Sequence, residues 1–92
     1  MKFKAELRTE DFGSAGSRRL IRRGMFPAEM YGKKGNVHLV MNAHDFDLAL
    51  RRFHEGEECE IEVQVETYKC IFKELQEDIM KGTILHADFQ MV

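Results

Sequence analysis

Apolar and polar residues alternate along several short stretches of this chain, which is the pattern of strands that bury one face. The expected strands are residues 2–8, 28–31, 37–41, 57–65, 68–74 and 84–91. The alternation places Leu7, Val65 and Leu85 on the buried side of their strands. We expect a basic turn at residues 32–36 and a second turn near residues 66–67.

Two short helices are predicted between the strands. Ser17 is the expected N-cap of the first helix, Gly24 its end, and Pro27 prevents it from continuing. Asn42 is the expected N-cap of the second. The apolar positions at helical spacing that should face the core are Phe46, Ala49, Leu50 and Phe53. These elements predict a mainly β fold, a small barrel or curled sheet with short helices, and a loop at residues 77–83.

The composition is that of a folded domain. The chain has 92 residues, of which 43% are hydrophobic and 33% are charged, with a single proline, so general disorder is not expected. No apolar stretch resembles a signal peptide or a membrane span, so we expect a cytoplasmic protein with no membrane partner. Cys59 and Cys70 are then expected to be reduced structural thiols, since neither belongs to a zinc-binding C-x-x-C pair.

Charge is divided unevenly along the chain. Residues 1–54 carry 11 Lys or Arg and 6 Asp or Glu, a net charge of +5, whereas residues 55–92 carry 3 and 10, a net charge of −7. This division predicts one surface that meets an anionic partner. The glutamates of residues 57–65 are best explained as a solvated sheet face, which would repel phosphate.

The strongest candidate for binding is the arginine segment at residues 13–23, where a small glycine-bearing loop precedes four arginines. If the helix starts at Ser17, then Arg18 and Arg19 lie in its first turn, and Arg22 shares their side. Cations are disfavoured at that end of the helix dipole, so their presence indicates a receptor for phosphates. The alternative is a solvated basic helix face without a ligand.

Three further residues could contact a nucleic acid. Tyr31 could stack on a base, or it could be an ordinary partly buried tyrosine. His86 and Asp88 share one face of a strand and could bind base edges or 2′-hydroxyls, although a surface pair is an equally good explanation. No nucleophile motif, phosphate loop or metal-ligand spacing supports an enzyme or a cofactor. The remaining histidines, interpreted as surface or capping residues, are His38, His44 and His54.

Several of these segments together resemble the bacterial large-subunit ribosomal protein twenty-five family, which binds 5S ribosomal RNA and includes the general stress protein CTC. The resemblance extends from Lys2 to Phe89. The segments that carry it are Ala-Glu-Leu-Arg (5–8), Gly-Ser-Ala-Gly-Ser-Arg-Arg-Leu (13–20), Phe-Pro-Ala-Glu-Met-Tyr-Gly (26–32), Leu-Gln (75–76) and His-Ala-Asp-Phe (86–89).

The resemblance implies a six-stranded barrel-like domain with two or three short helices, seated on the loop E region of 5S rRNA. The chain departs from the family pattern at Ser14, where a lysine is frequent, at Ile21, where an arginine is frequent, and at residues 76–79, where relatives commonly have Gln-Arg-His-Pro. The positions implied on the RNA face, to which we add Arg22 of the arginine segment, are Arg8, Ser17, Arg18, Arg19, Tyr31, His86 and Asp88.

The sequence therefore predicts a structural component of the large ribosomal subunit that binds 5S rRNA without catalysis. We expect residues 1–92 to be one RNA-binding domain, the short form that lacks the acidic second domain of many relatives, and to be monomeric when free. Two alternatives remain. One is a stress-linked RNA-binding or ribosome-associated factor. The other is a protein-interaction module that uses the acidic sheet and does not bind RNA.

Overall fold

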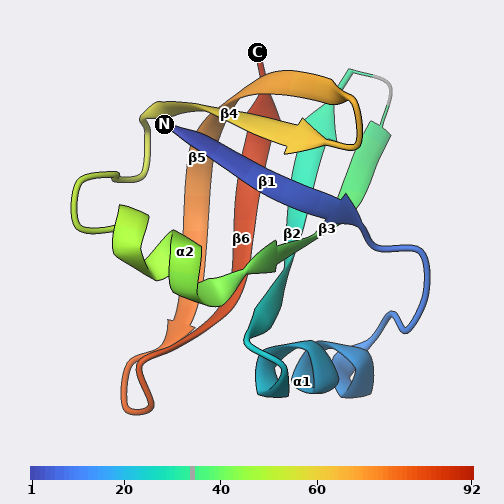
Figure 1. Ribbon diagram of the computed structural model, residues 1–92, viewed down its shortest axis with the longest axis vertical. Coiled ribbons are helices and arrows are strands. Elements are labelled where there is room, and N and C mark those ends of the chain that lie inside the picture. The colour runs from blue at the N-terminus through green and yellow to red at the C-terminus, as the bar shows by residue number, and fades with distance from the viewer. Residues whose placement is uncertain (34) are drawn as a thin grey trace.

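Six strands close into a barrel in the order β1-β3-β2-β6-β5-β4, which confirms the mainly β fold (Figure 1). The computed structural model describes residues 1–33 and 35–92, so position 34 of the expected basic turn lies outside the described residues. The strands are β1 (Lys2–Leu7), β2 (Met25–Gly32), β3 (Gly35–Asn42), β4 (Glu58–Val63), β5 (Glu66–Asp78) and β6 (Thr83–Met91). The helices are α1 (Ser14–Arg22) and α2 (Ala43–Ala49), and neither has the length and apolar composition that a membrane-spanning helix needs.

Two parallel pairings close the barrel. Strand β1 runs parallel to β4, with Phe3 opposite Ile61, and β2 runs parallel to β6, with Ala28 opposite Ala87. The other four pairings are antiparallel. Closure leaves no long free sheet edge, and it places the first strand of the chain beside the acidic fourth strand.

The core is built around phenylalanines. Phe46 of α2 is fully buried, and its ring centroid lies 5.0 Å from that of Phe3 and 5.4 Å from that of Phe26. It also meets Phe72 and Phe89 edge to face, so one helical residue joins rings from four strands. The expected cap of this helix is confirmed, because the Asn42 side chain accepts a hydrogen bond of 3.0 Å from the backbone N–H of Asp45.

The hairpin between β4 and β5 corrects two expectations. Val63 pairs with Glu66, so the turn consists of Gln64, with φ of 57°, and Val65, rather than lying near residues 66–67. Val65 is therefore 97% exposed, and its expected place in the core is wrong. The alternation continues for two residues after the strand has ended, which is why the pattern misplaced the turn.

Two leucines expected in the core are also exposed. Leu85 lies in an irregular part of the β5–β6 pairing, between the pairs Gln76–His86 and Glu77–Ile84. The bulge turns Leu85 outward, to 38% exposure, and puts Ile84 in the core. Leu7 is 40% exposed at the end of β1.

Two strands are longer than expected. Strand β5 reaches Asp78, so the predicted loop at residues 77–83 shrinks to residues 79–82, because pairing with β6 overrides the polar local sequence. Strand β2 begins at Met25 and includes Pro27, which does not interrupt the sheet. Pairing between β2 and β6 starts only at Ala28, and a proline is tolerated where a strand has a free edge.

The two cysteines lie directly opposite each other on β4 and β5, as free, buried thiols. Burial raises the pKa of Cys59 to about 12 and that of Cys70 to about 11. Because the thiolate is the reactive form, both side chains act as small apolar residues of the core.

Candidate nucleic-acid interface

The arginine helix starts earlier than the sequence predicts. Its N-cap is Gly13, with φ of 97°, and the expected cap, Ser17, lies inside the helix and donates a hydrogen bond of 3.1 Å from its hydroxyl to the Gly13 carbonyl. Arg18 and Arg19 are therefore not in the first turn. The prediction that they form a phosphate receptor together with the free backbone N–H groups of the helix start is wrong. The expected end is confirmed, since Gly24 has φ of 79° and its N–H bonds to the Ile21 carbonyl.

A close contact explains the early start. Gly16 is the one buried residue of α1, and a Cβ atom at this position would lie 1.7 Å from the backbone oxygen of Asp11. The loop at residues 8–13 thus crosses directly over the start of the helix, which only a glycine allows. The helix therefore begins before Ser17, with Gly13 as its N-cap.

Asp11 holds two of the expected RNA-binding arginines. Its carboxylate accepts two hydrogen bonds from Arg19, one of them 2.8 Å long from Nε, and its carbonyl accepts a bond of 2.7 Å from Arg8. The bond with Arg19 lowers the pKa of Asp11 below its ordinary value. By contrast, Arg18 and Arg22 are exposed and make no ion pair with any described residue. They are four residues apart, so they share one side of the helix.

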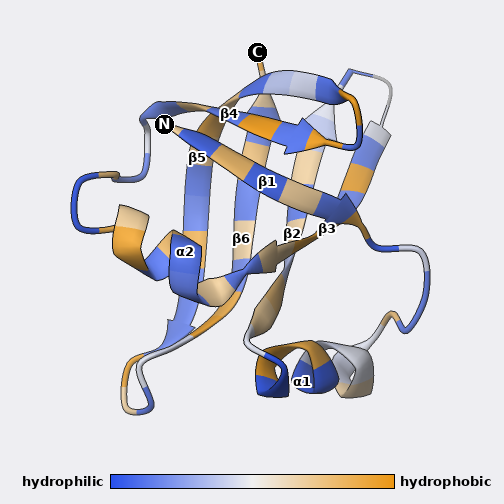
Figure 2. Cartoon of the chain, viewed as in Figure 1, coloured by the Kyte–Doolittle hydropathy of each residue, from blue (hydrophilic) through white to orange (hydrophobic). Residues whose placement is uncertain are grey.

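A row of polar side chains begins at Arg8, directly after β1, and crosses the outer surface of β3, β2 and β6. The backbone N–H of Arg8 bonds to the carbonyl of His38, which is paired with Glu29, which is in turn paired with Asp88. We call Arg8, His38, Glu29 and Asp88 the outer row. For His38, Glu29 and Asp88, strand alternation turns the side chain outward and the following residue into the core, which is visible as alternating bands along β6 (Figure 2). Histidine Nδ1 atoms approach the carboxylates, His38 to Glu29 at 3.1 Å and His86 to Asp88 at 3.2 Å.

Tyr31 joins this row from β2. Burial, together with the neighbouring carboxylates of Glu29 and Asp88, raises the pKa of Tyr31 to about 12. The structure thus brings together four of the expected residues, which are Arg8, Tyr31, His86 and Asp88. Helix α1 packs against β2 and β6, at the end of the barrel where β2 begins (Figure 1).

Two atoms of the outer row lack hydrogen-bond partners. Among the described residues, the buried side-chain polar atoms without a partner are Arg8 Nε and Asp88 Oδ1. The His86 Nδ1 atom lies within ion-pair distance of this oxygen but is not aligned as a hydrogen-bond donor. An unsatisfied buried polar group costs about 1–3 kcal/mol. A ligand that offers both an acceptor and a donor would remove both penalties.

Four residues of this surface were not predicted from the sequence to belong to it. Asp11 and Phe12 lie in the loop before the helix, and an apolar residue in so polar a loop was the only available signal. Glu29 and His38 belong to the outer row only because β2 and β3 pair in this register. His38 is exposed, as expected, but it is not an isolated histidine.

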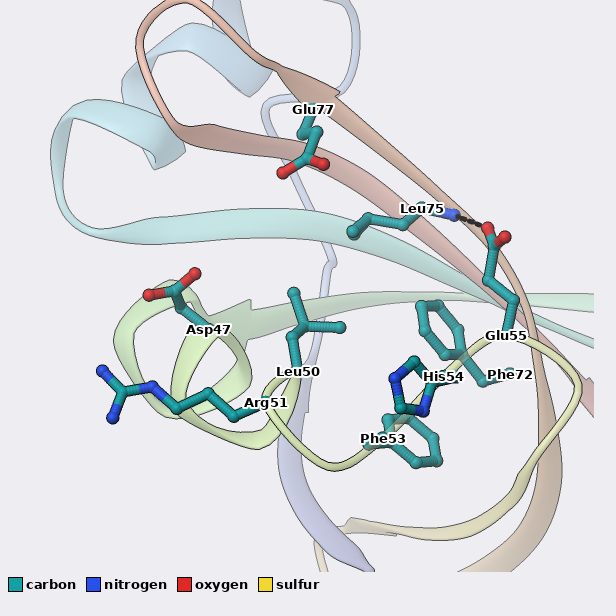
Figure 3. A pocket seen from close by; sticks show the side chains of 9 residues that line it. All are labelled: Asp47, Leu50, Arg51, Phe53, His54, Glu55, Phe72, Leu75 and Glu77. Atoms are coloured by element: carbon teal, nitrogen blue, oxygen red, sulfur yellow. Dashed lines mark hydrogen bonds between the residues drawn. The ribbon is translucent and has the colours of Figure 1, made fainter.

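A cavity of about 710 Å³ lies elsewhere, between the end of α2 and β5 (Figure 3). Leu50 and Leu75 line it, together with the carboxylates of Asp47, Glu55 and Glu77, and Glu55 accepts a hydrogen bond of 2.8 Å from the Leu75 N–H. Leu75 and Glu77 pair with the inward residues of β6, so the cavity and the outer row lie on opposite faces of this strand pair. No three histidine, cysteine or acidic side chains of residues 1–33 and 35–92 are grouped to hold a metal ion.

The fold and this surface define a small, closed six-stranded barrel that carries an arginine helix beside a row of mixed charge. The sequence matches the model of the Ribosomal L25p family over residues 3–89. The chain therefore belongs to this family.

Curated relatives support the same assignment. The chain is 35% identical over 82 residues to "Large ribosomal subunit protein bL25" of Caldanaerobacter subterraneus subsp. tengcongensis, a match that covers 87% of this chain and 41% of that protein. It is 38% identical to proteins of the same name from Geobacillus thermodenitrificans, covering 82% of this chain and 36% of the relative, and from Cutibacterium acnes, covering 97% and 43%. The chain thus spans less than half the length of these three relatives.

Proposed function

We propose that this chain is a structural, non-enzymatic component of the large ribosomal subunit and that it binds the loop E region of 5S rRNA. Membership of the Ribosomal L25p family and the names of its relatives support a ribosomal role. In this proposal the protein acts in the cytoplasm on the ribosome, is monomeric when free, and needs no cofactor of its own.

The observation that carries the RNA-binding part is the pair of unsatisfied atoms in the outer row. Arg8 Nε is a donor and Asp88 Oδ1 an acceptor, and both belong to residues that the family resemblance assigns to RNA. RNA presents phosphate oxygens as acceptors, and base amino groups and 2′-hydroxyls as donors. A surface that only attracted phosphate would not place the carboxylates of Glu29 and Asp88 in one row with Arg8.

Each part of the surface has its own role in this proposal. Arg18 and Arg22 bind phosphates as exposed, unpaired cations, while Arg19 keeps Asp11 and the loop in place. Tyr31, His86 and Asp88 recognise base edges and 2′-hydroxyls, and Ser17 supports the helix start. An irregular RNA helix is required, because the major groove of regular A-form RNA is too deep and narrow for side chains to read.

The test compares the binding of the chain to a loop E fragment and to a fully paired RNA of equal length, over a series of salt concentrations. The variant is Arg18→Ala/Arg22→Ala, which spares the Arg19–Asp11 pair. The matched control is Arg51→Ala/Arg52→Ala, which removes two exposed arginines that follow α2.

We expect the unmodified chain to prefer loop E. The helix variant should lose about tenfold in affinity per phosphate contact, and its salt slope should fall by about 1.5. The control should change neither quantity appreciably. Equal binding of the unmodified chain to both RNAs, or equal losses in the two variants, would contradict the proposal and favour the protein-interaction alternative.

A further inference from the structure

Phe12 is an exposed aromatic residue inside the proposed RNA surface. Its side chain is 53% exposed, although it lies in an ordered loop between β1 and α1. The guanidinium carbon of Arg8 lies 5.1 Å from the ring centroid. The ring of His38 meets the ring of Phe12 edge-on at 5.3 Å. Both neighbours belong to the outer row.

The loop around Phe12 is held in place from both sides. The residue before it, Asp11, is bonded to Arg8 and Arg19, and the residue after it, Gly13, caps the helix. Phe12 is therefore presented in a defined position and does not need to be ordered on binding, which reduces the entropy cost of using it. If Phe12 served only to pack the loop against the barrel, we would expect its ring to be buried under the loop rather than half exposed.

We propose that Phe12 is a stacking platform for one unpaired or extruded nucleobase of the RNA, an inference that rests on the proposed function. Aromatic side chains bind splayed bases through their π faces, and a neighbouring cation strengthens such a site. Arg8 supplies that cation, and its Nε is the donor that lacks a partner. A nucleotide at this position therefore offers its base to Phe12 and a phosphate or 2′-hydroxyl oxygen to Arg8.

Exposure alone does not make such a site. Ile79 and Met80, at the tip of the β5–β6 hairpin, are 85% and 97% exposed, but no aromatic contact or cation–π contact is found there in the described part of the chain. The combination of ring, cation and unsatisfied donor distinguishes Phe12. Ile79 is therefore a suitable control for the loss of an exposed apolar side chain.

The experiment measures loop E binding by the chain and by three variants over a salt series. Phe12→Leu keeps an apolar side chain but removes the ring, Phe12→Tyr keeps the ring, and Ile79→Ala is the control. The thermal midpoint of each variant shows whether it is folded. A panel of loop E fragments, each with one base removed, then identifies the stacked base.

We expect Phe12→Leu to weaken binding by about 5- to 150-fold, the range for one stacked base, with an unchanged salt slope. Phe12→Tyr and Ile79→Ala should bind like the unmodified chain. One abasic fragment should weaken the unmodified chain by a similar factor and leave Phe12→Leu unaffected, because the two changes remove the same contact.

Three results would overturn the platform. Selective binding by the unmodified chain with equal affinity for Phe12→Leu would remove the platform and leave the proposed function intact. If Phe12→Leu and Phe12→Tyr both bind loop E more weakly, and with a smaller salt slope, then Phe12 only positions Arg8. Failure of the unmodified chain to prefer loop E would remove the proposed function, and the platform with it.

Discussion

The outer row and the outer face of the β4–β5 hairpin are built by the same rule but carry different chemistry. On both, strand alternation turns every second side chain away from one shared core. On β4 these residues are three glutamates in a regular run, Glu58, Glu60 and Glu62. In the outer row each carboxylate instead meets a histidine or a tyrosine, and two polar atoms have no partner. The candidate site is thus distinguished by different polar groups that lie together with some of their hydrogen bonds unmade, and not by charge alone.

The acidic face is also less isolated than its sequence suggests. Parallel pairing places Lys2 opposite Glu60 and Lys4 opposite Glu62, and antiparallel pairing places Lys69 opposite Glu60 from the other side. Opposite charges at such positions stabilise a sheet by about 0.2–1 kcal/mol per pair. The division of charge between the two halves of the sequence is therefore not a division between two faces of the barrel.

The largest expected effect comes from the core that both faces share. Phe46→Ala removes the ring that joins Phe3, Phe26, Phe72 and Phe89, and it should lower the free energy of unfolding by about 3–5 kcal/mol. Urea unfolding followed by circular dichroism measures this change. A loss below about 1 kcal/mol would show that α2 is not an integral part of the core.

A smaller effect should separate the two faces. Gly16→Ala forces a Cβ atom against the Asp11 carbonyl, so we expect a loss of about 1–3 kcal/mol in unfolding free energy and weaker loop E binding. The environment of the buried thiols between β4 and β5, reported by the NMR chemical shifts of Cys59 and Cys70 in the folded state, should not change. Ser14→Ala, an exposed change in the same helix, is the control and should stay within about 0.5 kcal/mol. Equal stability of Gly16→Ala and Ser14→Ala would contradict the close approach of loop and helix.

The smallest effect is a pH dependence specific to the outer row. The pKa of Tyr31 is raised to about 12 from an ordinary value of 10.0, so the folded state keeps this proton when the unfolded state has lost it. The stability that Tyr31 contributes is therefore complete below pH 10 and is lost as the pH rises towards 12. Ultraviolet absorbance of the phenolate, measured in a Tyr68→Phe background, follows this titration.

Replacing one neighbouring charge tests the cause of the raised Tyr31 pKa. Asp88→Asn removes a carboxylate that disfavours the phenolate, so the Tyr31 titration should move to lower pH. Glu60→Gln, on the acidic face, should leave it in place. An unchanged titration in Asp88→Asn would mean that Tyr31 and Asp88 do not interact, and Tyr31 would then not belong with the outer row.

The sequence by itself determined the elements and their inward residues. Phe46 and Phe53 were predicted in the core and are buried there, and Gly24 and Asn42 were predicted to bound their helices and do so. These predictions succeed because helix caps and strand alternation depend on residues close together in the chain. The exposure of Val65 shows their limit, since alternation does not say where a strand stops.

Only the tertiary structure decided which strands lie side by side and where the arginine helix begins. The outer row depends on the registers between β1, β3, β2 and β6, and these are set by closure of the barrel rather than by any local pattern. The start of α1 depends on the contact between Gly16 and the Asp11 carbonyl, five residues earlier and across a turn. A surface made of residues from three strands and the loop after β1 exists only once these long-range contacts are made, because no single segment holds enough of it to be recognised.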